Sequence, residues 1–249
     1  MKHLIALAAA GAALATASPG QAQDEVDRFL EPGLQTGTRF KRAPETADQG
    51  EARGLQKRVA KCVYFRNKDA SRELLAHSDM DRIDFDAFGQ ASDTLFEDLD
   101  VAECIGTVMR GSQYRMYMRI PYSTLRNLLA EEVYLQDNKV AVAIPANAPR
   151  DLENRYGYER LNPRTAALTL VGDCVTHSSV DDAHAFLESR PGSSDEEAMF
   201  DALAPTVVAC HDTDEEEVAL PISMIRQITA DALWARSHYG AAAAQGATN

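Results

Sequence analysis

Residues 61–75 read KCVYFRNKDASRELL, and residues 173–187 read DCVTHSSVDDAHAFL. The two stretches share a Cys-Val pair, an aspartate seven residues after the cysteine, and a closing pair of apolar residues. A second match follows, between IPYSTLRNLLAEEVY at residues 120–134 and LPISMIRQITADALW at residues 220–234. Matching segments in the same order predict that the chain contains one structural unit twice.

The four cysteines are divided evenly between the two copies. The first copy holds Cys62 and Cys104, and the second holds Cys174 and Cys210. Four cysteines allow three pairings, but a unit that was copied whole should carry its own bridge. We therefore expect the disulfides Cys62–Cys104 and Cys174–Cys210, each restricting the unfolded chain by about 4 kcal/mol on the chain-entropy model. The alternative of a metal site lacks the close cysteine spacing that zinc sites use.

The first residues predict export. Lys2 and His3 form a short basic start, residues 4–15 are apolar, and the small-residue stretch ATASPGQA follows. This pattern is typical of a signal peptide, cleaved here near Ala22. No later segment approaches the roughly 20 apolar residues of a membrane helix, so we expect no transmembrane segment in the mature chain. The mature chain is then soluble and periplasmic or secreted, where thiols pair as disulfides.

The composition limits the possible partners. The chain has 38 acidic and 25 basic residues and a net charge of −13 at pH 7. Removing residues 1–22 takes away one lysine and no acid, so the mature chain is more negative still. Such a charge repels nucleic acid and anionic membranes. We therefore expect no nucleic-acid partner.

Helical periodicity predicts a mainly α-helical fold, with a small α+β fold as the alternative. In the first copy Leu55, Val59 and Val63 follow one another at the spacing of a helix turn. Apolar and polar residues alternate at residues 113–119 (QYRMYMR), which predicts a short strand, with residues 217–220 as its counterpart. We expect two homologous disulfide-bridged helical units, each with a short strand before its last helix. Units this small should pack together as a pseudo-twofold pair.

Changes in composition place the boundaries between these parts. Residues 23–54 are polar and rich in glycine and proline, and residues 136–166 hold several prolines. The predicted organisation is a signal peptide at 1–22, a disordered lead at 23–54, unit 1 at 55–135, a connector at 136–166, unit 2 at 167–239, and a disordered tail at 240–249.

The repeated pattern is Cys-Val, an aspartate with two apolar residues, a second cysteine, and then S-x-[LI]-R followed by an aromatic residue. This pattern resembles a group of uncharacterised exported proteins of alphaproteobacteria. The resemblance covers roughly residues 55–239 and implies a family scaffold without a known activity. It rests on Cys62, Cys104, Arg126, Tyr134, Cys174, Cys210, Arg226 and Trp234.

A surface for a partner is predicted where tyrosine and arginine gather in this acidic chain, because both are enriched at binding interfaces. Arg126 and Arg226 hold matching positions, and a guanidinium suits carboxylate or phosphate recognition. The candidate partner-binding residues are Tyr114, Arg115, Tyr117, Arg119, Arg126 and Arg226. Two alternatives remain. Each matched arginine could pair with an internal acid near Glu131 or Asp231, and the tyrosine and arginine cluster could face the acidic counterpart in the second copy.

Two clusters could hold a metal. His177, Asp181 and His184 would share one face of a continuous helix, as a zinc or other transition-metal site requires. Against this, Ser178 and Ser179 favour the start of a new helix. The acidic tract at 212–217 lacks the glycine and the ligand spacing of an EF-hand, which favours a solvated turn.

No catalytic motif stands out in the sequence. G-x-S-x-G, H-E-x-x-H and a glycine-rich phosphate loop are all absent. We therefore predict an exported, non-enzymatic binding or structural module of the cell envelope, without a cofactor. Its expected partner is an envelope protein or another periplasmic component. The alternative is a metal-assisted hydrolase that uses His177, Asp181 and His184.

Overall fold

The computed structural model describes residues 47–110, 118–152, 155, 162–211 and 220–246. The predicted signal peptide and most of the predicted lead lie outside the described residues. The helices in the first half of the chain are α2 (Gln49–Arg66), α3 (Lys68–Ala76), α4 (Phe85–Phe88), α5 (Leu95–Asp98), α6 (Val101–Met109) and α7 (Tyr122–Asp137). Those in the second half are α8 (Pro163–Ser178), α9 (Val180–Glu188), α10 (Ser194–Cys210) and α11 (Ile222–Gly246). The predicted mainly α-helical class is confirmed.

The short strands predicted before the last helix of each unit are not found in the described part of the chain. Residues 118–121 and 220–221 lead into α7 and α11 without strand structure, and residues 113–117 and 217–219 lie outside the description. Within the described ranges, strand pairing is limited to a bridge between Ser78 and Ile83. An extended segment becomes a strand only where a second strand meets it, and among the described residues no second strand lies beside residues 118–121 or 220–221.

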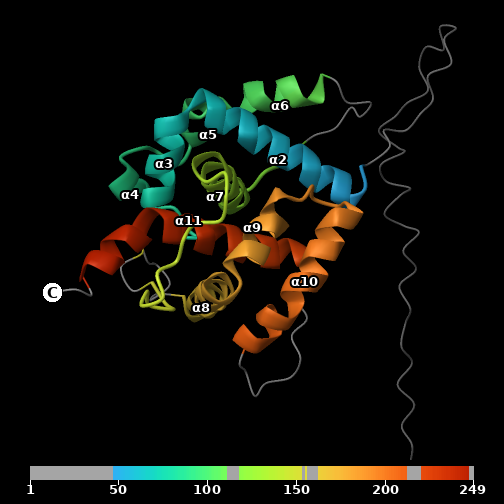
Figure 1. Ribbon diagram of the computed structural model, residues 1–249. Coiled ribbons are helices and arrows are strands. Elements are labelled where there is room, and N and C mark those ends of the chain that lie inside the picture. Colours follow the sequence, from blue (N-terminus) through green and yellow to red (C-terminus); the bar gives the residue numbers. More distant parts are fainter. Residues whose placement is uncertain (1–46, 111–117, 153–154, 156–161, 212–219, 247–249) are drawn as a thin grey trace, which may run out of the picture. The chain divides into compact units, whose positions relative to one another are not determined.

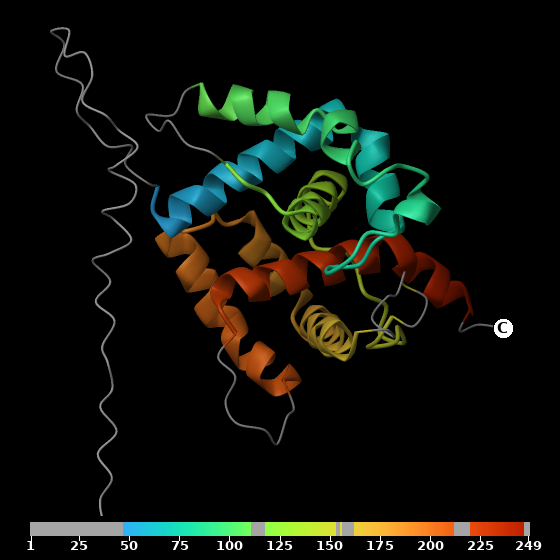
Figure 2. The ribbon, with the colours of Figure 1, turned by 180° about the vertical axis from the view of Figure 1, so that it is seen from behind.

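Helices α7 and α11 form the centre of the structure. They pack against each other; α2 and α3 also pack on α7, and α8 and α9 on α11. Figure 1 shows α2 and α6 above α11 and α8 below it, with α10 reaching up beside the start of α2, and Figure 2 shows the same arrangement from behind. The order α2, α3, α6, α7 thus corresponds to α8, α9, α10, α11. The duplication and the pseudo-twofold axis both stay predictions.

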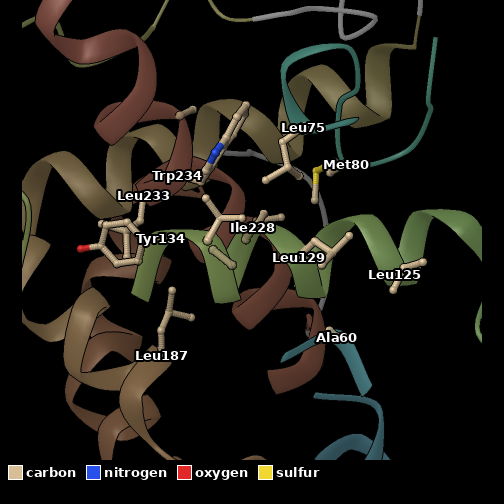
Figure 3. Close-up of a cluster of buried hydrophobic side chains, with 14 of the residues drawn as sticks. Ala60, Leu75, Met80, Leu125, Leu129, Tyr134, Leu187, Ile228, Leu233 and Trp234 are labelled. Carbon is tan, nitrogen blue, oxygen red and sulfur yellow. The ribbon is translucent and has the colours of Figure 1, made fainter. Parts of the chain in front are cut away.

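The two halves share one hydrophobic core. Leu129 and Tyr134 of α7 lie in the same buried cluster as Ile228, Leu233 and Trp234 of α11 (Figure 3). The cluster extends into both halves, with side chains from α2, α3, α8, α9 and α10. A unit of about 70–80 residues buries too little apolar surface to be robust alone, which accounts for this joint core.

Each disulfide fastens a peripheral helix to the first helix of its own half. Cys62 joins Cys104, which links α2 to α6, and Cys174 joins Cys210, which links α8 to α10. The Cα atoms are 5.6 Å and 5.7 Å apart, within the usual range for a disulfide. The predicted pairing is confirmed.

Three helix boundaries differ from the sequence expectation. Helix α2 begins at Gln49, inside the predicted lead, because the Asp48 carboxylate caps it by accepting a hydrogen bond of 2.7 Å from the Glu51 N–H. Helix α8 begins inside the predicted connector, where the Asn162 side chain caps it ahead of Pro163. Helix α11 continues to Gly246, through most of the predicted tail.

Two glycines bring the halves into backbone contact. Gly192, in the turn between α9 and α10, has a φ of 76°, in the left-handed region. A Cβ atom on Gly192 would lie 2.3 Å from the Cα atom of Gly50 in α2. Only glycine allows both this conformation and this approach.

We predict that Gly192→Ala lowers the free energy of unfolding by about 2 kcal/mol, because alanine is strained at positive φ and its methyl group meets Gly50. The matched control is Gly54→Ala, where a Cβ atom meets nothing within 4 Å. That change should raise stability by about 0.5–1 kcal/mol through helix propensity. Urea unfolding of the oxidised proteins measures both values; a shift of the same sign in both variants would refute the contact.

Candidate functional site

Two arginine–carboxylate pairs cross between α7 and α11 in a reciprocal arrangement. Arg126 of α7 donates to the carboxylate of Asp231 in α11. Arg226 of α11 donates to Glu131 of α7, from Nε at 2.9 Å and from Nη2 at 2.7 Å. Each arginine therefore pairs with the acid that lies beyond the matching arginine on the other helix. Reciprocal contacts of this kind are typical of an isologous interface.

Arg226 also organises the turn between α9 and α10. Its guanidinium donates to the carbonyl oxygens of Phe186 at 3.1 Å, Leu187 at 2.6 Å and Ser189 at 2.9 Å. It reaches the Glu196 carboxylate at 3.2 Å, and Arg53 of α2 holds the same carboxylate with two bonds of 3.0 Å and 2.8 Å. One buried network therefore joins α2, α7, α9, α10 and α11.

Two further arginines hold the segment between the halves. Arg155 bridges two buried acids, Asp173 at 2.9 Å and Asp231. The Asp173 carboxylate also accepts the Leu152 N–H at 2.9 Å. Arg236 donates to the carbonyl oxygens of Asp173 at 2.8 Å and Pro149 at 3.2 Å. The part of the predicted connector that the structure describes is therefore bonded to α8 and α11.

Arg126 and Arg226 do not form a surface for an external partner. Their exposed fractions are 1% and 5%, and their partners are internal. That part of the predicted binding surface is wrong, and the alternative of pairing with Glu131 and Asp231 is correct. Burial raises the pKa of Glu131, but Arg226 and Lys57 outweigh it and hold that pKa below its usual value. The carboxylate therefore stays ionised inside the protein.

The predicted metal ligands do not assemble. The helix breaks at Ser179, so His177 lies in the last turn of α8 while Asp181 and His184 lie on α9. His184 Nδ1 lies 2.9 Å from the hydroxyl of Tyr134, and His177 Nε2 lies 3.3 Å from the carbonyl oxygen of Ala148. Across the described ranges, no three His, Cys, Asp or Glu side chains are arranged to hold a metal ion. The metal-site hypothesis for these residues is therefore contradicted.

Two hollows flank the segment at residues 142–145. The larger, of about 500 Å³, is lined by both His177 and Asp181, and the smaller, of about 180 Å³, is lined mainly by apolar side chains with Arg236. His184 lines neither. The structure thus brings together two of the three predicted ligands.

The remaining candidates of the predicted partner surface are only partly described. Tyr114, Arg115 and Tyr117 lie outside the described residues, as does the acidic tract at 212–217. Arg119 is exposed. The sequence prediction for this surface stays a prediction.

A second exposed surface, which was not predicted from the sequence, lies on α2 and at the start of α3. We call it the basic stripe and define it as Arg58, Lys61, Phe65 and Lys68, all exposed. Phe65 is 49% exposed, and the Lys68 ammonium lies 5.5 Å from the centre of its ring. The sequence does contain basic residues at helical spacing along this stretch. To predict that they form an exposed surface, however, one must know that Val59 and Val63 point inward.

Glu132 differs from Glu131 and Asp231, the buried acids that form ion pairs. It is 2% exposed, and its Oε1 has no hydrogen-bond partner among the described residues. Burial raises its pKa to about 7; Lys57 opposes the shift and the neighbouring Glu131 adds to it. The folded protein therefore holds this proton more tightly than the unfolded chain does.

We predict that Glu132 makes the protein less stable as pH rises from about 4.5 to about 7. The loss amounts to about 3 kcal/mol, since each unit of pKa shift corresponds to about 1.4 kcal/mol. Glu132→Gln should remove this loss, and so raise the unfolding free energy at pH 8 with little change at pH 4. Denaturant unfolding across this pH range provides the measurement.

Glu131→Gln on the same helix is the matched control, and it should act in the opposite sense. The Glu131 pKa is lowered in the folded protein, so its carboxylate stabilises the fold above the usual pKa, and this contribution is lost as pH falls. The amide should therefore destabilise at pH 7. Equal effects of the two substitutions would contradict the assignment.

Comparisons with known proteins give no further lead. No family model matches the chain, and neither a curated protein nor a solved structure matches it. None of the described helices is long and apolar enough to cross a membrane. The two disulfides fit an exported protein.

Proposed function

We propose that the chain is an exported, non-enzymatic binding module of the cell envelope. Its two disulfides suit an oxidising compartment, and its first residues have the pattern of a signal peptide cleaved near Ala22. The resemblance of the repeated cysteine unit to exported alphaproteobacterial proteins is consistent with this location.

The observation that carries the proposal is that the buried charged side chains pair with one another inside the protein. Arg126, Arg226, Glu131 and Asp231 are all tied into ion pairs that join the two halves. An enzyme centre instead presents titratable groups to a cleft that a substrate can enter. Interior pairs of this kind favour a scaffold, with function located on its exterior.

The basic stripe is the exterior feature best suited to binding. It combines an exposed aromatic ring with cations on one side of a helix, and aromatic residues and arginine are enriched at the centres of interfaces. Disulfide Cys62–Cys104 fastens α2 to α6, and the core holds its inner face. A rigid surface loses little conformational entropy when it binds.

We predict that crosslinking in intact cells joins the exported chain to a discrete second protein. A photoreactive phenylalanine analogue in place of Phe65 should form the product, identified by mass spectrometry. The same analogue in place of Val208, which is 73% exposed on α10, is the matched control and should give little of it.

Arg119→Glu tests the surface predicted from the sequence in the same cells. Loss of the product would extend the interface to the segment before α7, and retention would confine it to α2. If neither analogue nor a general amine-reactive crosslinker captures any partner of the folded, oxidised chain, the binding function is refuted.

A further inference from the structure

We propose that the basic stripe on α2 binds an extended, acidic segment of another protein. This inference rests on the proposed binding function and adds the chemical class of the partner. Three observations carry it: the side chains of Arg58 and Lys61 have no ion pair or hydrogen bond among the described residues, they lie in one row with an aromatic ring, and the matching positions in the second half are covered by a segment of the chain itself.

The cations of the stripe differ from their neighbours on the same helix. Arg53 and Lys57 are paired with buried acids, and Arg66 is paired with Asp100 and Glu103. Within the described residues, Arg58 and Lys61 have no ion pair or hydrogen bond of their side chains. Two exposed cations in an acidic protein are thus left available to an external acid.

The stripe has the geometry of a linear binding surface. Arg58, Lys61 and Phe65 are separated by three and four residues, which places them in one row along a helix. Lys68, at the start of α3, extends the row beyond Phe65. The seven-residue step from Arg58 to Phe65 along α2 spans about 10 Å, the length of about three residues of extended chain. A short extended peptide therefore matches the row.

The second half of the protein supplies the precedent for a peptide segment that covers this helix face. When Cys62 is aligned with Cys174, Lys61 matches Asp173 and Phe65 matches His177. On α8 these matched positions are covered by the chain itself. Asp173 is 1% exposed and binds the Leu152 N–H and Arg155, and His177 Nε2 lies 3.3 Å from the carbonyl oxygen of Ala148.

The charges of the two faces are opposite. On α8 the helix contributes an acid, Asp173, and the covering segment contributes a base, Arg155. On α2 the matching position is a base, Lys61, and it is exposed. A segment that covers α2 as residues 148–152 and Arg155 cover α8 would therefore contribute aspartate or glutamate. Phe65 adds an apolar contact near the end of the row.

A protein segment suits the stripe better than an anionic membrane does. Polybasic sites for anionic lipid use about four to eight clustered cations, and the stripe has three. The chain as a whole carries −13 at pH 7, which repels an extended anionic surface. A short acidic segment meets only the local field of the stripe.

The experiment uses the full mature chain, oxidised, and a fluorescent ten-residue peptide of glutamate, aspartate and leucine. The control peptide replaces each acid with its amide. Fluorescence anisotropy at low ionic strength should detect binding of the acidic peptide and no binding of the amide peptide, and added salt should weaken the binding.

Matched variants distinguish an effect of the basic stripe on binding from an effect of the net charge of the protein. Arg58→Glu with Lys61→Glu should weaken binding by about tenfold or more, because each reversal replaces attraction with repulsion. Arg164→Glu with Arg190→Glu changes the net charge equally at exposed positions of the second half, and should change binding by less than about twofold. Phe65→Ala should weaken binding several-fold without a change of charge. Circular dichroism of each variant verifies that it is folded.

Three results would overturn the inference. The folded wild-type chain should bind the acidic peptide, so absence of binding refutes the inference. Equal losses of binding in the two double variants would show that binding depends on the net charge of the protein and not on the basic stripe. Binding to vesicles that contain phosphatidylserine, lost in the α2 double variant while the peptide does not bind, would assign the stripe to lipid. A partner captured in cells that is insensitive to the α2 variant would refute this inference and leave the binding function standing.

Discussion

The structure depends on a pair of buried ion pairs that cross between its two central helices. Arg126 pairs with Asp231 and Arg226 with Glu131, and all four side chains are almost fully removed from water. Burying a charge costs several kcal/mol, which an ion pair offsets only when its geometry is good and its other polar atoms are satisfied. Any other register of α7 on α11 would leave charges unpaired, so the pairs specify one arrangement of the halves.

The same guanidiniums extend this constraint outward. Arg226 binds carbonyl oxygens at the end of α9, and Arg126 donates to the side chain of Ser78 at 3.0 Å and to its carbonyl oxygen at 3.1 Å. The loops after α3 and α9, which occupy matching places in the two halves, are therefore each held by the matching arginine. A residue that satisfies buried carbonyl groups and crosses the interface cannot be exchanged for lysine without loss, because lysine lacks the planar fork.

The sequence predicted what repetition and periodicity encode. Both disulfides followed from the even division of cysteines, and the helical class followed from the spacing of residues such as Val59 and Val63. The sequence could not decide whether Arg126 faces solvent or an internal acid, because this depends on which face of α7 meets α11. The metal-site hypothesis failed at Ser179, where the helix breaks. The start of α2 was missed because Gly50 and Gly54 have poor helix propensity. The Asp48 cap and the contact between Gly50 and Gly192 can be recognised only in the folded structure.

The two halves have the same framework but use one helix face differently. The described residues of the predicted connector cover α8, whereas Lys61 and Phe65 at the matching positions of α2 are exposed. On α8, Asp173 is stable in the interior because Arg155 and the Leu152 N–H reach it. On α2, an acid at position 61 would lie exposed beside the buried carboxyl of Glu132, and would raise the cost of ionising it. Lysine at this position instead lowers that cost, as its effect on the Glu132 pKa indicates. The change of charge between the two faces is therefore what their different surroundings require, and it leaves α2 with a cationic exterior.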